Sequence, residues 1–141
     1  MSQNKDLLLR LSSLHAQLLK RVNGSLSVHG ISLSEIAVLD LLDQAPNQTL
    51  RRIDLADQTG LTASGITRLL NPMEKIGLVA KEEHPRDARV SLVKLTDAGA
   101  RILSEANETL AASAERLFAP LGDDGKATLS DLLNRLPGGV R

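Results

Sequence analysis

The stretch LTASGITRLLNPMEKIGLVAKEEHPRDARVSLVKLT, residues 61–96, decides the fold of this chain. Thr62 is a good N-cap, and apolar residues then recur on one side of the helix that it would start. These apolar residues are Ile66, Leu69, Leu70 and Met73. The polar residues that lie elsewhere around the helix are Ser64, Thr67, Arg68 and Asn71. One side of this helix therefore packs on a core, and the other is free to contact a partner.

A hairpin with a basic tip is predicted after this helix. Residues 78–82 and 89–92 have the apolar and polar alternation of two strands. The segment between them contains Pro85 and Asp87, which favour a turn, and arginines lie within and beside it. A helix followed by a hairpin with basic side chains at its tip can contact a DNA duplex in two places.

The residues before this stretch predict the first half of a helix-turn-helix. A short helix is expected over about 50–59. Its apolar side consists of Ile53, Leu55 and Ala56. A helix-turn-helix needs a small residue where its helices cross, a residue that tolerates left-handed backbone in the turn, and a branched apolar residue in the second helix. Ala56, Gly60 and Ile66 supply these three in register.

Helices are also predicted on the N-terminal side of this motif. One runs from Lys5 to Val22 and carries a broad stripe of leucines. The next begins at a capping box formed by Ser32 and Glu35 and stops before Pro46.

Two further helices are predicted after the hairpin. Thr96 caps a long helix that runs from Asp97 to about Ala119 and ends near Pro120. A final helix starts at Asp123 or Asp124. It is expected to bury Leu129, Leu132, Leu133 and Leu136. Because the first, long and last helices all carry apolar stripes, we expect them to build a homodimer interface. The alternative is that they close the core of one monomer.

Composition narrows the function. Lysine plus arginine total 17 and aspartate plus glutamate total 17, so any nucleic-acid contact must depend on where the charges lie. The chain has no cysteine, which excludes disulfides and thiolate metal sites. His15, His29 and His84 lack ligand spacing, so no metal and no cofactor are expected. Enzyme motifs such as G-x-S-x-G and H-E-x-x-H are absent, and an enzyme is not expected.

The N-terminal segment gives no sign of a membrane protein. No apolar run approaches the roughly 20 residues of a membrane span. Lys5, Asp6 and Arg10 interrupt the segment in which a signal peptide would have its apolar region. We therefore expect a cytoplasmic protein without a membrane partner.

Taken in order, these motifs resemble those of the MarR family of bacterial transcriptional regulators. The matching pieces are ISLSEIAVLDLL at 31–42, LRRIDLADQTG at 50–60, LTASGITRLL at 61–70, GLV at 77–79, Asp87-x-Arg89, and LTDAG at 95–99. The resemblance implies a mainly α protein with a small β-hairpin wing (α+β), namely a winged helix-turn-helix domain in an obligate dimer. The recognition helix would span 61–76 and the wing 79–95.

The resemblance also implies a domain plan and a class of ligand. Residues 32–95 of the single 1–141 chain would form the DNA-binding lobe, and 1–31 with 96–141 the helical dimerisation region. Relatives often bind small effectors, frequently aromatic and anionic, between these two parts. The expected lining here is Leu14, His15 and Leu18 with the second helix.

By this resemblance, the DNA-contacting positions lie on the helix and the wing. Those on the helix are Thr62, Ser64, Thr67 and Arg68, and those on the wing are Arg86 and Arg89. Arg68 is expected to read guanine, Arg89 to enter the minor groove, and Asp87 to orient Arg89 by ion pairing. Phosphate contacts are expected from Lys75, Lys81 and Arg86, with Arg51 and Arg52 as further candidates. The alternatives are that Arg68 is a solvated surface residue and that Arg89 forms only a turn ion pair with Asp87.

Some residues depart from the family pattern and leave a second function open. Pro72 lies inside the expected recognition helix, where it removes the hydrogen bond to the Arg68 carbonyl and should bend or end the helix. Ala80 and Ala88 stand where relatives often carry basic residues, which weakens the expected wing contact. The leading hypothesis is a dimeric repressor released by an effector. The alternative is a winged helix that binds protein without sequence-specific DNA binding.

Overall fold

The computed structural model describes residues 2–138, which are mainly helical with one small antiparallel sheet. In chain order the elements are α1 (Gln3–Leu26), α2 (Leu33–Gln44), β1 (Thr49–Arg51), α3 (Arg52–Thr59), α4 (Ala63–Lys75), β2 (Val79–Glu83), β3 (Ser91–Leu95), α5 (Asp97–Phe118) and α6 (Gly122–Arg135). Short 3-10 turns occupy Ser27–His29, Pro46–Gln48 and Ala119–Leu121. The predicted class, mainly α with a small β wing, is confirmed.

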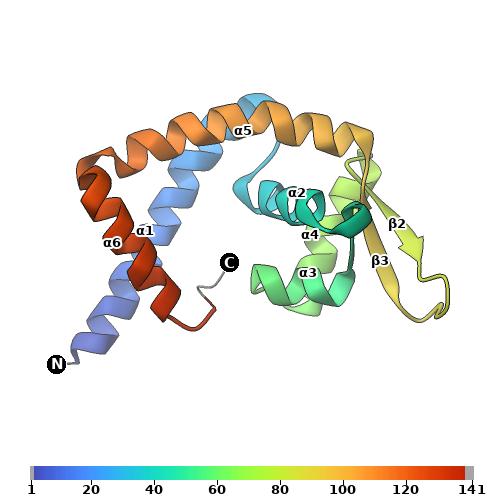
Figure 1. Cartoon of the computed structure of the whole chain (residues 1–141), viewed down its shortest axis with the longest axis horizontal. Coiled ribbons are helices and arrows are strands. Elements are labelled where there is room, and N and C mark those ends of the chain that lie inside the picture. Colours follow the sequence, from blue (N-terminus) through green and yellow to red (C-terminus); the bar gives the residue numbers. More distant parts are fainter. Residues whose placement is uncertain (1, 139–141) are drawn as a thin grey trace.

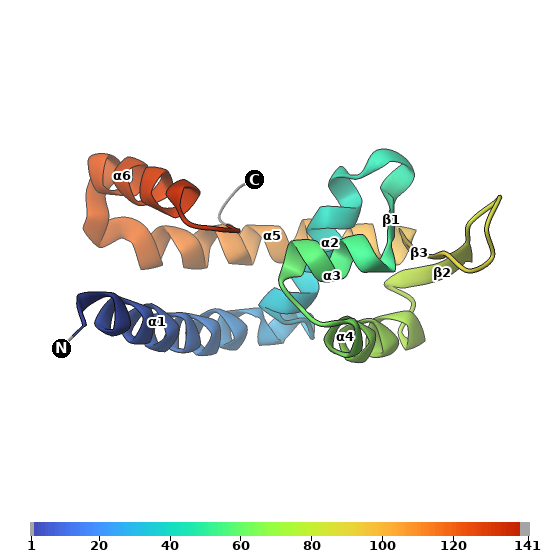
Figure 2. The same ribbon diagram turned by 90° about the horizontal axis from the view of Figure 1, so that it is seen from below.

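The helix α5 connects two structurally different parts of the protomer (Figure 1). α6 follows the C-terminal end of α5, α1 runs from the middle of α5 toward the same side of the molecule, and α2, α3, α4 and the sheet form a lobe near the N-terminal end of α5. The turned view shows the β2–β3 hairpin at the far end of the lobe, opposite α6 (Figure 2). The chain therefore consists of a lobe, formed by α2, α3, α4 and the sheet, and a helical region, and one long helix joins them.

The hydrophobic core lies in the lobe. The largest side chains with essentially no solvent exposure are Leu26, Val38, Leu39, Leu42, Leu55, Ile66, Leu70, Met73 and Val93. They come from the C-terminal end of α1 and from α2, α3, α4 and β3. The core of the described chain therefore consists of aliphatic side chains and Met73, and it joins the helices of the lobe to the sheet.

The sheet has one more strand than the sequence predicts. β1 pairs antiparallel with β3, with Leu50 opposite Val93, so the strand order is β1-β3-β2. The predicted helix over 50–59 was therefore wrong at its start, because residues 49–51 are extended and α3 begins at Arg52. Ile53 is also not on the buried side of α3, since its side chain is 61% exposed.

Thr96 and Gly99 join α5 to the base of the wing. The Thr96 hydroxyl donates a hydrogen bond to the Gly77 carbonyl and lies 3.0 Å from the Leu78 carbonyl oxygen. The same hydroxyl accepts from the Gly99 amide at 3.0 Å and caps the helix as predicted. A Cβ at Gly99 would collide with the Leu78 carbonyl and lie 2.8 Å from Leu95 Cδ1. Only glycine lets α5 start this close to the wing.

The leucines of the helical ends are largely exposed in the protomer. Nine of the thirteen exposed large hydrophobic side chains in residues 2–138 lie in α1 or after α5, and they are Leu7, Leu8, Leu9, Leu11, Leu14, Leu121, Leu132, Leu133 and Leu136. Leu132, Leu133 and Leu136, which the last helix was expected to bury, are therefore not covered by the protomer itself. Their exposure is the observation on which a dimer proposal can be built.

No single helix in residues 2–138 combines enough length with enough apolar residues to cross a bilayer. The segments Gln3–His29 and Leu33–Gln44 reach the threshold only when they are joined across a 72° bend.

We predict that Gly99→Ala destabilises the protein whereas Gly24→Ala does not. Both glycines lie in helices, but a Cβ at Gly24 meets nothing within 4 Å. Overpacking costs about 1–3 kcal/mol, so the free energy of unfolding of Gly99→Ala should fall by about 2 kcal/mol. Gly24→Ala should gain up to about 1 kcal/mol of helix propensity. Urea unfolding at one fixed protein concentration measures both, and equal midpoints for the two variants would contradict this account of Gly99.

Candidate nucleic-acid interface

The helix-turn-helix has the turn geometry that the sequence predicts. Gly60 ends α3 in the left-handed conformation, with φ of 73°, and the Leu61 amide donates to the Ala56 carbonyl at 3.0 Å. Thr62 then caps α4 by accepting a hydrogen bond from the Gly65 amide at 3.0 Å. These short-range interactions end α3 and start α4 in a new direction.

One side of α4 packs on the core, and another forms an exposed stripe. Ile66, Leu70 and Met73 are fully buried. Ser64, Arg68 and Lys75 are exposed and are spaced by four and seven residues, which places them along one side of a helix. The Arg68 and Lys75 side chains have no ion-pair partner within residues 2–138. The exposed stripe therefore presents short hydroxyls and free cations to the solvent.

Pro72 does not end the recognition helix. α4 continues through Pro72 to Lys75, and the Ile76 amide donates to the Pro72 carbonyl at 3.2 Å. The prediction that helix is retained over 62–71 is confirmed, and the prediction that it could end at Pro72 was wrong. The sequence argument considered only the lost backbone hydrogen bond, whereas Leu70 and Met73 on either side are both fully buried and hold the helix on the core.

Arg52 is tied to α4 rather than free in solution. Its NH1 group donates to the Thr67 hydroxyl at 3.1 Å, and its NH2 group lies 3.3 Å from a Glu74 carboxylate oxygen. The Thr67 hydroxyl in turn donates to the Ala63 carbonyl at 3.0 Å. A hydroxyl has one proton, so Thr67 in this arrangement has none left for a phosphate. The sequence did not predict this network. The one indication in it was that residues 67 and 74 are seven positions apart and so share a helix face.

The wing carries one paired and one free arginine near its tip. The Asp87 carboxylate accepts from Arg89 Nε at 3.1 Å, from its NH2 group at 3.2 Å and from its amide at 3.0 Å. These hydrogen bonds lower the pKa of Asp87 below its ordinary value, so the carboxylate stays ionised at neutral pH. The Arg89 side chain nevertheless remains 91% exposed, whereas no described residue pairs with the Arg86 side chain.

The basic residues of the lobe fall into two classes. Arg51 pairs with Asp54 at 2.9 Å, and Lys94 lies 3.8 Å from Glu82. Hydrogen bonding to Asp54 raises the pKa of Arg51 and lowers that of Asp54. The exposed cations without an ion-pair partner in the described part of the lobe are Arg68, Lys75, Lys81 and Arg86. These lie on α4 and on the wing, of which β2 is one strand, and both elements were predicted to contact DNA.

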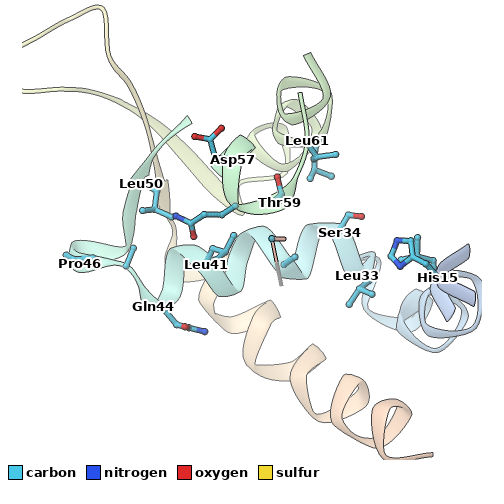
Figure 3. Close-up of a pocket in the computed structure, with 16 residues that line it drawn as sticks. His15, Leu33, Ser34, Leu41, Gln44, Pro46, Leu50, Asp57, Thr59 and Leu61 are labelled. Atoms are coloured by element: carbon cyan, nitrogen blue, oxygen red, sulfur yellow. The ribbon is translucent and has the colours of Figure 1, made fainter. Parts of the chain in front are cut away.

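A cavity lies between the lobe and α1. It has a volume of about 960 Å³ and is bordered by α1, α2, β1, α3 and, through Leu61 and Leu69, by the turn before α4 and by α4 itself (Figure 3). His15 lines it as predicted, but Leu14 and Leu18 do not, because Leu19 is the neighbouring α1 leucine that faces it. Leu18 packs against the core instead. The ionisable side chains among its described lining residues are those of His15 and Asp57.

The other histidines have local roles. His29 Nε2 lies 2.7 Å from the Thr109 hydroxyl and connects the turn after α1 to α5. His84 Nδ1 accepts a hydrogen bond from the Arg86 amide at 3.1 Å in the wing turn. No set of three or more histidine, aspartate or glutamate side chains in residues 2–138 is grouped to hold a metal ion.

The fold and this surface define a winged helix-turn-helix protein of the DNA-binding type. The family model of the MarR family matches residues 31–91, which span α2 through the wing. The chain is 30% identical over 107 residues to YkoM of Bacillus subtilis (strain 168), an uncharacterized HTH-type transcriptional regulator, and the match covers 76% of this chain and 68% of YkoM. The chain belongs to the MarR family of transcriptional regulators.

Solved structures are similar over nearly the whole chain. A mutant of MarR from E. coli in complex with operator DNA superposes with a TM-score of 0.84 at 26% identity, covering 97% of this chain and 100% of that one. CouR from Rhodococcus jostii RHA1, bound to p-coumaroyl-CoA, superposes with a TM-score of 0.80 at 26% identity, covering 94% of each chain. The likeness extends beyond the lobe to the helical region.

Proposed function

We propose that this protein is a transcriptional repressor that binds a pseudo-palindromic operator as a homodimer. The observation that carries the proposal is the set of free cations on α4 and the wing, because unpaired exposed cations are the groups that can displace counterions from phosphates. The family membership and the operator complex of MarR support it. Two recognition helices related by a dimer axis would enter successive major grooves about 34 Å apart.

Within this proposal the side chains have distinct roles. Arg68 reads guanine, since its planar fork matches O6 and N7, and Thr62 and Ser64 contact phosphate or base edges at close range. Lys75, Lys81 and Arg86 pair with phosphates, and Arg89, oriented by Asp87, enters the minor groove. Thr67 acts through Arg52 and the backbone rather than by donating to DNA, because its proton is already used.

The dimer is proposed to form through the exposed leucines of α1 and α6. Both helices belong to the helical dimerisation region, residues 1–31 and 96–141. A groove of about 530 Å³ between α5 and α6 continues this apolar surface and is lined by Phe118, Leu129 and Leu133. Several exposed leucines gathered on neighbouring helices are typical of a surface that binds another protein.

The cavity between the lobe and α1 is the proposed effector site. Its volume lies within the range of about 300–1,000 Å³ that small-molecule sites occupy, and leucines form much of its wall. A small aromatic or anionic compound fits this lining, with a ring N–H of His15 as the hydrogen-bond donor to an anionic group. The complex of CouR with p-coumaroyl-CoA supports an effector role for this family.

We expect Arg68→Ala to weaken binding to the preferred operator by about 1 to 3 kcal/mol and to relax preference at one base position per half-site. Fluorescence anisotropy against a duplex selected from a random pool, at several salt concentrations, measures this.

Lys75→Ala should instead make the negative slope of log K against log salt shallower by about 0.9 per contacted phosphate. The control is Arg116→Ala, because Arg116 is an exposed arginine in the last turn of α5, far from α4 and the wing. Failure of the wild type to bind any duplex at low salt would favour the protein-interaction alternative.

Leu8→Glu should dissociate the dimer. Leu8 is 67% exposed in the protomer, so a charge there costs little in a monomer but is strongly unfavourable inside an apolar interface. Ile53→Glu, at a 61% exposed residue in the lobe, is the matched control and should leave the dimer intact. Light scattering coupled to size-exclusion chromatography gives the masses, and a monomeric wild type at micromolar concentration would contradict the dimer.

An effector should raise the melting temperature and release DNA. A ligand present at 100 times its dissociation constant adds about 2.7 kcal/mol to stability. A panel of aromatic carboxylates paired with their neutral amides tests this by thermal shift. Ala37→Leu narrows the cavity and should abolish the shift while DNA affinity is retained, since Ala37 faces the cavity. A shift that persists in Ala37→Leu would place the ligand elsewhere, and no shift across the panel would contradict this effector class.

A further inference from the structure

The recognition helix α4 lacks one backbone hydrogen bond at Pro72. The side chain of Arg52 bridges one residue before this position and one after it. Pro72 has no amide hydrogen, so the Arg68 carbonyl lacks the helix donor that residue 72 would otherwise supply. α4 nevertheless continues to Lys75. The missing hydrogen bond belongs to Arg68, the residue proposed to read guanine, so the geometry of this segment bears directly on sequence recognition.

Arg52 binds α4 on both sides of Pro72. Thr67 precedes Pro72 and Glu74 follows it, and the two are seven residues apart on the same face of the helix. One guanidinium donates to Thr67 through NH1 at 3.1 Å and to Glu74 through NH2 at 3.3 Å. Because Arg52 lies at the start of α3, the bridge also connects α3 to both halves of α4.

This bridge is less exposed to solvent than the ion pair in the wing. The Arg52 and Glu74 side chains are 21% and 26% exposed, whereas the Asp87–Arg89 pair in the wing is 36% and 91% exposed. Partial burial reduces screening by water and salt, and a planar guanidinium with several donors can hold two acceptors at once. A lysine ammonium at this position could not span the same two groups with fixed geometry.

We propose that Arg52 is a positioning residue that holds the recognition helix straight across Pro72 and thereby sets the orientation of Arg68. This inference rests on the proposed DNA-binding function for its consequence but not for its structural part. It replaces the expectation that Arg52 contacts phosphate, because both of its terminal groups are engaged within the protein.

The test compares Arg52→Gln with Arg51→Gln. Arg51 is the matched control because it is adjacent in sequence and its guanidinium pairs with Asp54, a residue of the neighbouring α3, rather than with α4. The ratio of affinities for the selected operator and for random duplex is measured by anisotropy across a salt series. Arg52→Gln should lower this ratio by about tenfold, of the order expected when one guanine contact loses its geometry. Arg51→Gln should leave the ratio unchanged.

The salt series separates positioning from phosphate contact. Substitution of a positioning residue leaves the slope of log K against log salt for random duplex unchanged. Loss of a phosphate contact makes this negative slope shallower by about 0.9. Pro72→Ala restores the amide donor to the Arg68 carbonyl, so the double variant Arg52→Gln/Pro72→Ala should recover most of the lost preference. Arg52→Lys keeps the charge without the two-point bridge and should behave like Arg52→Gln, which covers the case in which Arg52→Gln folds poorly.

A measurement without DNA keeps this inference separate from the proposed function. Hydrogen–deuterium exchange of a peptide covering residues 70–77 should be faster in Arg52→Gln than in wild type, and normal again after Pro72→Ala is added. A reduced salt slope, an unchanged operator preference or unchanged exchange in a folded Arg52→Gln protein would overturn the assignment. If wild type binds no DNA but the exchange result holds, the proposed function fails while the bridge stands.

Discussion

The close contact between the start of α5 and the base of the wing is the constraint on which the arrangement of this protein depends. Gly77 ends the recognition helix with a left-handed φ of 81°, and the Leu78 amide returns to the Met73 carbonyl at 2.9 Å. Thr96 then binds the carbonyls of Gly77 and Leu78, and Gly99 lets α5 approach them. The end of the recognition helix and the start of the long helix are therefore fixed to each other within a few residues.

This junction gives the helical region a route to the DNA-contacting surface. α5 extends from the junction to α6, and the cavity lies between the lobe and α1. A compound in this cavity that changed the distance between the lobe and α1 would also act on α5, because α5 connects the lobe to the helical region. Because hydrogen bonds join the N-cap of α5 to the segment that follows α4, the start of α5 and the C-terminal end of α4 are coupled directly.

Much of the fold could be predicted from the sequence, and the errors have physical causes. The capping box of Ser32 and Glu35, the Thr62 cap and the Gly60 turn were all predicted correctly, because each depends on residues within a few positions of one another. β1 was missed because three residues are too few to show strand alternation, and its partner β3 lies some forty positions later in the chain. Helical periodicity identified the apolar face of α6 but not what covers it, and the structure leaves Leu132, Leu133 and Leu136 of this face exposed in the protomer.

The sequence by itself determined the recognition helix, its polar stripe, its caps and the basic wing, since these follow from hydrogen bonds and side-chain periodicity within single elements. Only the tertiary structure decided which arginines are free. Arg52 and Glu74 are 22 residues apart and meet only because α3 packs on α4, while Arg68 on the same helix meets no partner in the described chain. Pairing between elements depends on their relative placement, and that placement is set by the burial of Leu55, Ile66 and Leu70 in a shared core.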